Sequence, residues 1–284
     1  MLYQLLRREL ARLFGAKRAG SGTRADPSGA AAATGAARKL SENSIAKDTS
    51  YEALFLGHDG RLIDKWSHYF EIYDRHLAQF RNRPVKVLEI GVYHGGSLQL
   101  LRRFLGPQAA VVGIDIDARC AGYAEPGIRI EIGDQSNPAF WAAFFEKNGP
   151  FDLILDDGSH LNPHMIITFN SAWPFLNDGG ILMFEDCHTS YWAECQGGLR
   201  AKGSFIEFAK DRIDDLNAFW SHDAASLSPG RLTHELGSVS YYDSIVVFQK
   251  RVRGGPPRRR VAGTPSRELT PLEEQAFAGA WVRS

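Results

Sequence analysis

The 284-residue sequence contains few cysteines, no long apolar run and no excess of charge of either sign. Its three cysteines, Cys120, Cys187 and Cys195, are an odd number without zinc-like spacing, so neither a disulfide framework nor a cysteine metal site is indicated. The simplest compartment is therefore the reducing cytoplasm. No apolar stretch approaches the ~18 residues that cross a bilayer. Because 33 basic residues balance 33 acidic ones, there is no electrostatic argument for nucleic acid binding.

The two ends of the chain differ in composition from the middle. Residues 1–18 have the spacing of a basic amphipathic helix, and residues 19–44 are rich in glycine and alanine, which predicts a flexible linker. The helix is either an ordinary packed one or a peripheral contact with a membrane surface, and both alternatives stay open. Residues 251–284 form a basic tail in which 270–281 has the pattern of a short helix. A single folded domain is expected over residues 45–250.

This domain alternates short apolar runs with longer amphipathic stretches. The strand-like runs are 85–90, 110–115, 128–132, 151–156, 180–184 and 239–248. The helix-like stretches are 64–80, 96–105, 137–147, 162–176 and 203–220. Such alternation of strands and helices, with β-branched strands that do not alternate between apolar and polar residues, predicts an α/β fold with a doubly wound, mostly parallel sheet covered on both faces.

Ligands bind beyond the carboxyl ends of the strands in such sheets, so the residues that follow each run are informative. After the first run, Glu89, Gly91 and Gly95 form an E-x-G-x-x-x-G pattern that leads into a helix. Glycines let the backbone approach a ligand closely, but the spacing differs from the dinucleotide fingerprint, which disfavours a nicotinamide cofactor. Asp115 ends the second run, where an acidic side chain binds a ribose diol. Asp117 is better explained as a cap of the next helix.

The third run ends in Asp134 and Gln135, polar side chains suited to the edge of an adenine ring. Ser136 or Asn137 is equally suited to cap the helix that follows. Together, the glycine turn, the acid and the polar third strand end predict a nucleoside-type site.

The fourth and fifth runs carry the most informative residues. The fourth ends with Asp156 and Asp157, and the fifth is followed by Glu185 and Asp186. If these strands are neighbours, Asp157, Glu185 and Asp186 converge, and three carboxylates repel one another unless a cation is present. Hard oxygen ligands favour Mg²⁺, Mn²⁺ or Ca²⁺ over Zn²⁺.

Two histidines lie beside these acidic pairs. His160 follows Asp157 by three residues, where it is suited to act as general base for a hydroxyl proton. His188 follows the second pair, which allows a role as a metal ligand but favours a structural or substrate-lining one.

These motifs together resemble the metal-dependent sugar O-methyltransferases of macrolide biosynthesis, the mycinamicin type, and more distantly the cephalosporin hydroxylase and rhamnosyl O-methyltransferase group. The resemblance covers about residues 51–250. Its motifs are Asp64-Lys65-Trp66-Ser67-His68 with Tyr73, VLEIGVYHGGS (87–97), GIDID (113–117), GDQSN (133–137), LDDGSH (155–160), FEDCHTSYW (184–192), SFIEFAKDRIDDLNAFW (204–220) and YYDSIVVFQK (241–250).

The resemblance implies a class I methyltransferase fold of the Rossmann-like type with S-adenosylmethionine as cofactor. It implies that Asp157, Glu185 and Asp186 bind Mg²⁺ (or Mn²⁺) and that His160 is the catalytic base. The cofactor site implied by the motifs comprises Glu89, Gly91, Gly95, Asp115, Asp134, Gln135 and Asp156. Tyr191, Trp192 and His188 are expected to line the acceptor, although ordinary packing explains the two aromatic residues equally well.

A saccharide-containing acceptor and a homo-oligomer are the partners that this resemblance implies. Macrolide members of the family carry a large additional N-terminal domain in place of the short basic helix and linker. We therefore expect a glycan, a glycolipid or another glycosylated metabolite as acceptor. Two alternatives are a catechol-like acceptor at the same metal site and a non-catalytic nucleoside-binding module.

Overall fold

A computed structural model describes residues 49–278 and contains one seven-stranded sheet. The strands are β1 (Lys86–Ile90), β2 (Ala110–Asp115), β3 (Ile128–Ile132), β4 (Phe151–Asp156), β5 (Leu176–Phe184), β6 (Leu236–Tyr241) and β7 (Val246–Lys250). Their order across the sheet is β3-β2-β1-β4-β5-β7-β6. Strands β1 to β5 pair in parallel, and β7 pairs antiparallel with both β5 and β6. The predicted doubly wound, mostly parallel α/β fold is confirmed.

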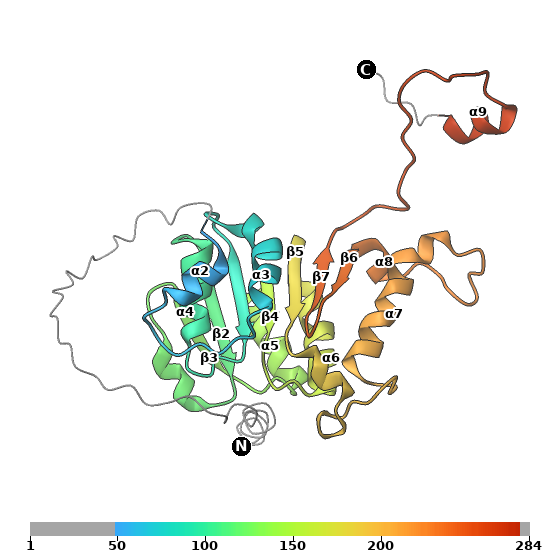
Figure 1. The fold of residues 1–284 in the computed structure, drawn as a ribbon. Helices are drawn as coiled ribbons and strands as arrows, with labels where there is room; N and C mark the ends of the chain where they lie inside the picture. The colour runs from blue at the N-terminus through green and yellow to red at the C-terminus, as the bar shows by residue number, and fades with distance from the viewer. Residues whose placement is uncertain (1–48, 279–284) are drawn as a thin grey trace, which may run out of the picture.

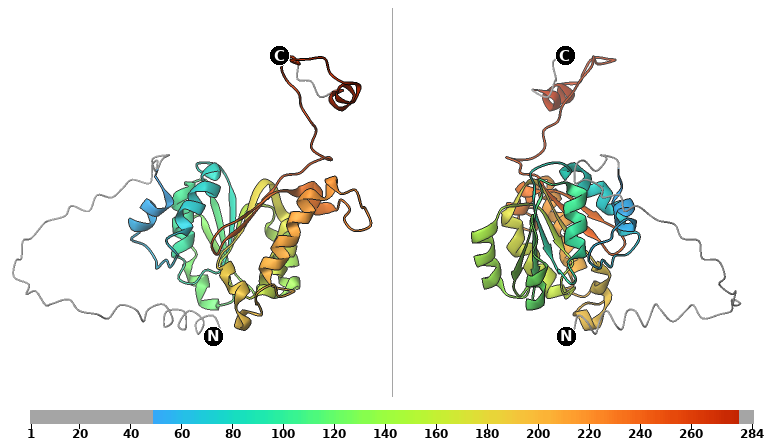
Figure 2. Two further views of the ribbon diagram at one scale, coloured as in Figure 1. Left: turned by 45° about the vertical axis from the view of Figure 1, so that its right-hand side comes forward. Right: turned by 90° about the vertical axis from the view of Figure 1, so that its left-hand side faces the viewer.

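Helices cover both faces of the sheet (Figure 1). The α-helices of the described residues are α2 (Tyr51–Leu56), α3 (Tyr69–Leu77), α4 (Gly96–Leu105), α5 (Pro138–Asn148), α6 (Asn162–Ala172), α7 (Phe205–Asn217), α8 (Arg231–Glu235) and α9 (Pro271–Phe277), of which α9 lies away from the sheet. One apolar cluster joins the sheet to α2, α3 and α4, and a second joins the opposite face to α5, α6 and α7. The right-hand view of Figure 2 shows the two helical layers on either side of the sheet.

The alternation of side chains along β1 determines which residues meet which layer. Val87 belongs to the cluster under α2, α3 and α4, whereas Leu88 belongs to the opposite cluster. Because successive side chains of a strand point to opposite faces, Glu89 lies on the same face as Val87. The strand therefore carries a carboxyl group into the layer formed by α2, α3 and α4.

Local sequence signals explain where several helices begin. The Asn137 side chain accepts hydrogen bonds from two backbone N–H groups at the start of α5, and the Ser204 side chain accepts one, from Glu207, at the start of α7. Asp117 caps the short 3₁₀ helix η2 (Ala118–Tyr123), as the sequence predicts. Gly95, with φ 77°, lies in the left-handed region directly before α4.

The predicted strand 239–248 is wrong as one element. The chain instead forms the hairpin of β6 and β7, and the Tyr242 N–H donates to the carbonyl of Ile245 to close the turn. Ser244 in this turn has φ 65°, which is incompatible with a continuous strand. The apolar pattern on either side of the turn conceals this break.

Two predicted helices are shorter than expected. The stretch 64–80 becomes helical only at Tyr69, because the buried Lys65 side chain comes from a non-helical segment. The stretch 162–176 gives α6, which ends at Ala172, then the 3₁₀ turn η3 (Trp173–Phe175) before β5 begins at Leu176. Pro174 has no N–H group to continue the α-helical pattern.

The ends of the chain are described unequally. The predicted helix of 1–18 and the linker of 19–44 lie outside the described residues, and the domain boundaries stay a prediction. The C-terminal segment leads away from the sheet to α9, within the predicted range 270–281 (Figure 1). None of the described helices combines the length and the apolar character needed to cross a membrane.

Candidate active site

The site lies at the carboxyl edge of the parallel strands, where the strand order reverses between β1 and β4. The Asp157 N–H donates to the carbonyl of Ile90, and the Glu185 N–H donates to the carbonyl of Asp156. The residues after β4 and β5 therefore extend the sheet by one step. This confirms the premise that these two strands are neighbours and that their acidic pairs lie together.

Lys65 lies between two of the three carboxylates. Its Nζ donates to Asp157 Oδ2 at 2.6 Å and to the two oxygens of Glu185 at 2.8 and 2.9 Å. The Lys65 side chain is 2% exposed. Burial alone would lower the pKa of Lys65, but the facing carboxylates raise it well above its usual value, so the ammonium form persists.

Two tyrosines of α3 also contact the carboxylates. The Tyr73 hydroxyl donates to Glu185, and the Tyr69 hydroxyl donates to Asp186 Oδ1 at 2.7 Å. Burial raises the pKa of both phenols well above their usual value, so they remain donors. Glu185 is 1% exposed, and burial raises the pKa of its carboxyl group above its usual value, although the attraction of Lys65 opposes this rise.

His160 faces the carboxylates of Asp157 and Asp186. Its Nε2 lies 3.6 Å from Asp157 Oδ1 and 3.4 Å from Asp186 Oδ2. His160 and Asp186 both have positive φ, 56° and 50°, an uncommon backbone conformation that concentrates at functional sites. The Thr189 hydroxyl donates to the carbonyl of His160 at 3.0 Å and ties the two loops together.

Asp157, His160 and Asp186 form a group whose potential metal-binding atoms all lie within 4.8 Å of one another. The sequence predicts Asp157, Glu185 and Asp186 as the ligand set. All three acids are in the site, but the oxygens of Glu185 face Lys65 and Tyr73. Asp157 and Asp186 therefore remain as the two carboxylates of the group, and His160 Nε2 lies beside them.

The glycine turn after β1 packs directly on the loop after β4. Gly91 has φ 94°, and a Cβ atom there would lie 2.0 Å from the carbonyl oxygen of Asp157. Gly95 packs against the Arg61 and Tyr123 side chains at the start of α4. Glu89 is fully buried, and this burial raises the pKa of its carboxyl group to about 7.

Asp115 holds the glycine turn from the end of β2. Its Oδ2 accepts the N–H groups of Val92 and Tyr93 at 2.9 and 3.1 Å, and its Oδ1 accepts the N–H of Asp117 at 2.9 Å. A carboxylate oxygen offers two lone pairs, so Asp115 Oδ1 can accept a second hydrogen bond beside the one from Asp117. This capacity suits a ribose hydroxyl.

The two polar residues after β3, Asp134 and Gln135, have different structural roles. Asp134 Oδ1 accepts bonds from the N–H and hydroxyl of Ser136 and so forms a local turn. Gln135 donates to both oxygens of Asp156 at 2.8 Å and accepts the N–H of Ser159 at 2.9 Å. Gln135 and Asp156 are buried and bond to each other, so their side chains brace the loop that carries Asp157 and His160.

The three residues predicted to line the acceptor follow β5 in the 3₁₀ turn η4 (Cys187–Tyr191) and directly after it. His188 Nδ1 is 3.0 Å from Ser244 Oγ, and the ring of Trp192 is 4.9 Å from the His188 ring. Tyr191 is 51% exposed.

Sequence reasoning assigned no role to Lys65, Tyr69 or Tyr73, although the Asp64–His68 segment and Tyr73 carry part of the resemblance. These three residues precede the first strand. No sequence spacing predicts their contacts with acidic residues at strand ends, which lie 92 or more residues further along the chain. The available signal was the presence of Lys65 and Tyr73 in a motif, and Tyr69 had none.

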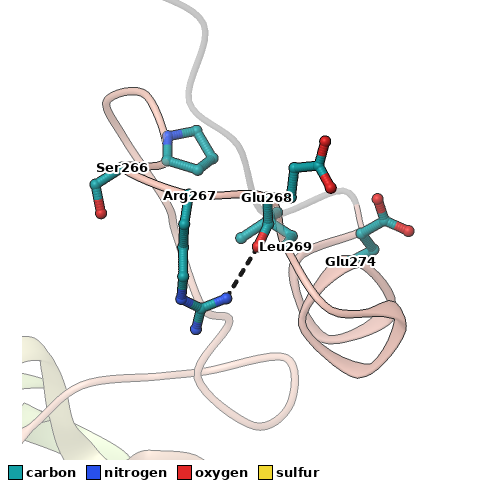
Figure 3. Close-up of a pocket in the computed structure, with 6 residues that line it drawn as sticks. Ser266, Arg267, Glu268, Leu269 and Glu274 are labelled. Atoms are coloured by element: carbon teal, nitrogen blue, oxygen red, sulfur yellow. Dashed lines mark hydrogen bonds between the residues drawn. The ribbon is translucent and has the colours of Figure 1, made fainter.

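A separate surface hollow occurs in the C-terminal segment. It is lined by Pro265, Ser266, Arg267, Glu268, Leu269 and Glu274. Figure 3 shows Arg267 bonded to the backbone of Glu268 within this segment. None of its lining residues comes from the strand ends, so it has no part in the site.

The strand order and the site at the switch in that order define a class I methyltransferase fold of the Rossmann-like type. A family model described as "Methyltransferase domain" matches residues 88–187, from β1 to the residue after the second acidic pair.

Two relatives with named activities are similar to about two thirds of this chain. The chain is 33% identical over 202 residues to 8-demethyl-8-alpha-L-rhamnosyl tetracenomycin-C 2'-O-methyltransferase of Streptomyces olivaceus, covering 68% of this chain and 53% of that protein. It is 31% identical over 188 residues to mycinamicin VI 2''-O-methyltransferase of Micromonospora griseorubida, covering 63% and 47%. The chain thus spans about half the length of these relatives.

A solved structure of the methyltransferase MycE from the mycinamycin pathway, in complex with Mg, SAH and mycinamycin VI, is 28% identical with a TM-score of 0.66. The match covers 74% of this chain and 56% of that one. The resemblance to the sugar O-methyltransferases that the motifs indicate is confirmed.

Proposed function

We propose that this chain is an S-adenosylmethionine-dependent O-methyltransferase that methylates a hydroxyl group of a saccharide-containing acceptor with the help of Mg²⁺. The observation that carries the proposal is the convergence of Asp157, Asp186 and His160 beside the glycine turn. The activities in the names of the relatives, and the Mg and SAH in the MycE structure, support the same chemistry.

The donor atoms of the site fit a hard divalent ion. Asp157 and Asp186 each direct a carboxylate oxygen toward the region that His160 faces, and such oxygens suit Mg²⁺ or Mn²⁺. Glu185 lies behind them, where it holds Lys65. A bound divalent ion lowers the pKa of an acceptor hydroxyl and orients it.

We assign the cofactor to the glycine turn after β1 and the residues that end β2 and β3. Gly91 and Gly95 shape the turn, and Asp115 retains the acceptor capacity for a ribose hydroxyl. Asp134 lies at the end of β3, where the adenine edge is expected. Glu89 is buried beneath the turn, and Gln135 and Asp156 support the site through the loop after β4.

In the proposed reaction, the acceptor hydroxyl oxygen attacks the methyl carbon as its proton passes to His160 Nε2. The C–O bond forms while the C–S bond of the sulfonium breaks, and S-adenosylhomocysteine leaves. An alcohol is a poor nucleophile, so a positioned base is what this reaction needs most from the protein.

A labelled-methyl assay tests the proposal. Protein with Mg²⁺ and methyl-labelled S-adenosylmethionine is offered methyl α-L-rhamnopyranoside and, separately, catechol. Label in the glycoside that disappears after chelation supports the proposal. Label in catechol alone contradicts the acceptor class. Absence of S-adenosylhomocysteine binding, measured by calorimetry, contradicts the methyltransferase function itself.

A further inference from the structure

Trp66 adjoins the candidate site and yet is partly exposed. It follows Lys65 directly, and Lys65 is bonded to Asp157 and Glu185. Whereas the Lys65 side chain is buried, Trp66 is 43% exposed. One residue of this segment thus enters the site while the next presents an indole ring beside it.

The Trp66 indole belongs to a row of rings. Its ring centroid is 6.2 Å from that of His188 in an edge-on arrangement, and the His188 ring is 4.9 Å from that of Trp192. These rings come from two segments that are more than 120 residues apart, the stretch before α3 and the turn after β5. We call Trp66, His188 and Trp192 the aromatic wall.

The hairpin between β6 and β7 braces this wall. Ser244 in the hairpin turn contacts His188 Nδ1 at 3.0 Å, and its neighbour Asp243 contacts His68 Nε2 through a carbonyl oxygen at 3.2 Å. The His188 ring is therefore held from a third segment, while Trp66 keeps much of its surface accessible. A supported ring that remains open to solvent is suited to receive a ligand, since little order is lost on binding.

The aromatic wall adjoins the polar residues of the site, Asp157, Asp186 and His160, which we call the polar floor. His188 lies two residues beyond Asp186, in the 3₁₀ turn η4 that follows Asp186 directly. Asp186 in turn lies 3.4 Å from His160 Nε2. A ligand that presents hydroxyls to Asp157, Asp186 and His160 therefore has the aromatic wall within reach.

A sugar ring matches this combination. Its hydroxyls are polar around the rim, whereas its C–H groups form apolar patches that pack on an indole ring. Pockets of this kind pair an aromatic lining with a few positioned polar groups. The wall and the floor thus provide both kinds of contact.

We infer that Trp66 is a specificity-determining residue that packs against the sugar ring of the acceptor while the reacting hydroxyl faces His160. This inference rests on the proposed function and adds to it a residue from the segment before α3. It also assigns the wall to the sugar itself rather than to an attached aglycone.

Ligand-observed NMR tests the inference without turnover. The dissociation constant of methyl α-L-rhamnopyranoside is measured by saturation transfer in the presence of S-adenosylhomocysteine and Mg²⁺. Trp66→Ala is expected to weaken binding by about five- to tenfold, in keeping with the loss of one aromatic contact. Trp66→Phe, which retains a ring face, is expected to stay within about twofold.

Trp220→Ala is the matched control. Trp220 is 59% exposed and ends the 3₁₀ turn η6 (Ala218–Trp220), which follows α7 and is separate from the segments that form the aromatic wall. Its removal is expected to leave the dissociation constant of the glycoside unchanged. Calorimetry of S-adenosylhomocysteine binding to each variant shows that the fold is intact.

The outcomes separate this inference from the proposed function. Equal glycoside affinity of Trp66→Ala and wild type overturns the role of Trp66. Binding of catechol without binding of the glycoside overturns the sugar assignment but leaves methyl transfer standing. Failure of wild type to bind S-adenosylhomocysteine contradicts the proposed function, and the role of Trp66 falls with it.

Discussion

The ammonium nitrogen of Lys65 lies 2.6 Å from Asp157 Oδ2, with both groups in the interior. The same nitrogen lies 2.8 Å from Glu185 Oε2. One side chain thus joins the segment before α3 to the ends of both β4 and β5. Two carboxylates that would otherwise repel each other in a medium of low polarity share this cation.

Removal of the Lys65 charge is expected to destabilise the fold. Lys65→Met leaves Glu185 buried without its partner, so the free energy of unfolding is expected to fall by about 3 kcal/mol. Urea denaturation followed by circular dichroism measures the change. The double variant Lys65→Met/Glu185→Gln is expected to recover more than half of the loss, because no buried carboxyl group at position 185 is then left without its cationic partner. No recovery in the double variant would show that the Lys65–Glu185 pair is not the source of the effect.

His160 is expected to act on the reaction and not on the cofactor. His160→Gln is expected to lower kcat by about 10²–10⁴-fold, the range for loss of a general base. Calorimetry is expected to give an unchanged affinity for S-adenosylhomocysteine, because His160 faces Asp157 and Asp186 across the site. A comparable loss in His164→Gln, whose ring contacts Ser159 instead, would contradict a specific role for His160.

Divalent-ion affinity is expected to depend on Asp186. Asp186→Asn removes a carboxylate from the group formed with Asp157 and His160, and we expect Mn²⁺ to bind at least about tenfold more weakly. Electron paramagnetic resonance of free Mn²⁺ measures this without acceptor. Asp214→Asn, on the exposed side of α7, is the control and is expected to behave as wild type. Equal affinities in all three proteins would place the ion elsewhere.

The buried carboxyl group of Glu89 makes the stability of the fold depend on pH. Burial raises its pKa from 4.5 to about 7, so between these values the folded protein retains a proton that the unfolded chain releases. The free energy of unfolding therefore falls as pH rises from about 4.5 to about 7, by up to about 3 kcal/mol from this group.

Glu89→Gln removes this titration and isolates the effect. The difference in unfolding free energy between the variant and wild type, measured by urea denaturation at several pH values, is expected to grow in favour of the variant up to about pH 7. Above that pH it should level off. A difference that is independent of pH would mean that Glu89 titrates alike in both states.

The sequence was sufficient to predict those parts of the site that lie at strand ends. Parallel strands bring their carboxyl ends to one edge, so the positions of Asp115, Asp157 and Asp186 follow from the strand pattern alone. Lys65 and Tyr69 could not be placed in this way. They precede the first strand, and their contact with the carboxylates depends on how that segment crosses the sheet edge, which periodicity does not determine.

The hairpin of β6 and β7 shows the same limit. Apolar residues lie on both sides of Asp243 and Ser244, so 239–248 has the pattern of one strand, whereas the Tyr242 N–H bond to the carbonyl of Ile245 and the positive φ of Ser244 form a turn there. This turn also positions the contact with His188. A local backbone feature with weak sequence signal thus supports one side of the site.

Gly91 couples the glycine turn to the loop that carries Asp157, and its substitution separates two effects. Gly91→Ala introduces a Cβ at φ 94° and also brings it to 2.0 Å from the carbonyl oxygen of Asp157. The backbone conformation alone costs about 1–2 kcal/mol for an L-residue.

Gly179→Ala supplies the matched comparison, because Gly179 has φ 80° and a Cβ atom there would meet no other atom within 4 Å. We expect Gly179→Ala to lower the free energy of unfolding by the conformational amount only. Gly91→Ala is expected to lose more and also to bind S-adenosylhomocysteine more weakly, because the two loops must move apart. Since both variants share the conformational strain, equal destabilisation in urea with unchanged S-adenosylhomocysteine affinity would mean that the loops yield without disturbing the site. A larger loss in Gly91→Ala would instead establish that close contact between the two loops keeps the cofactor turn beside the acidic residues.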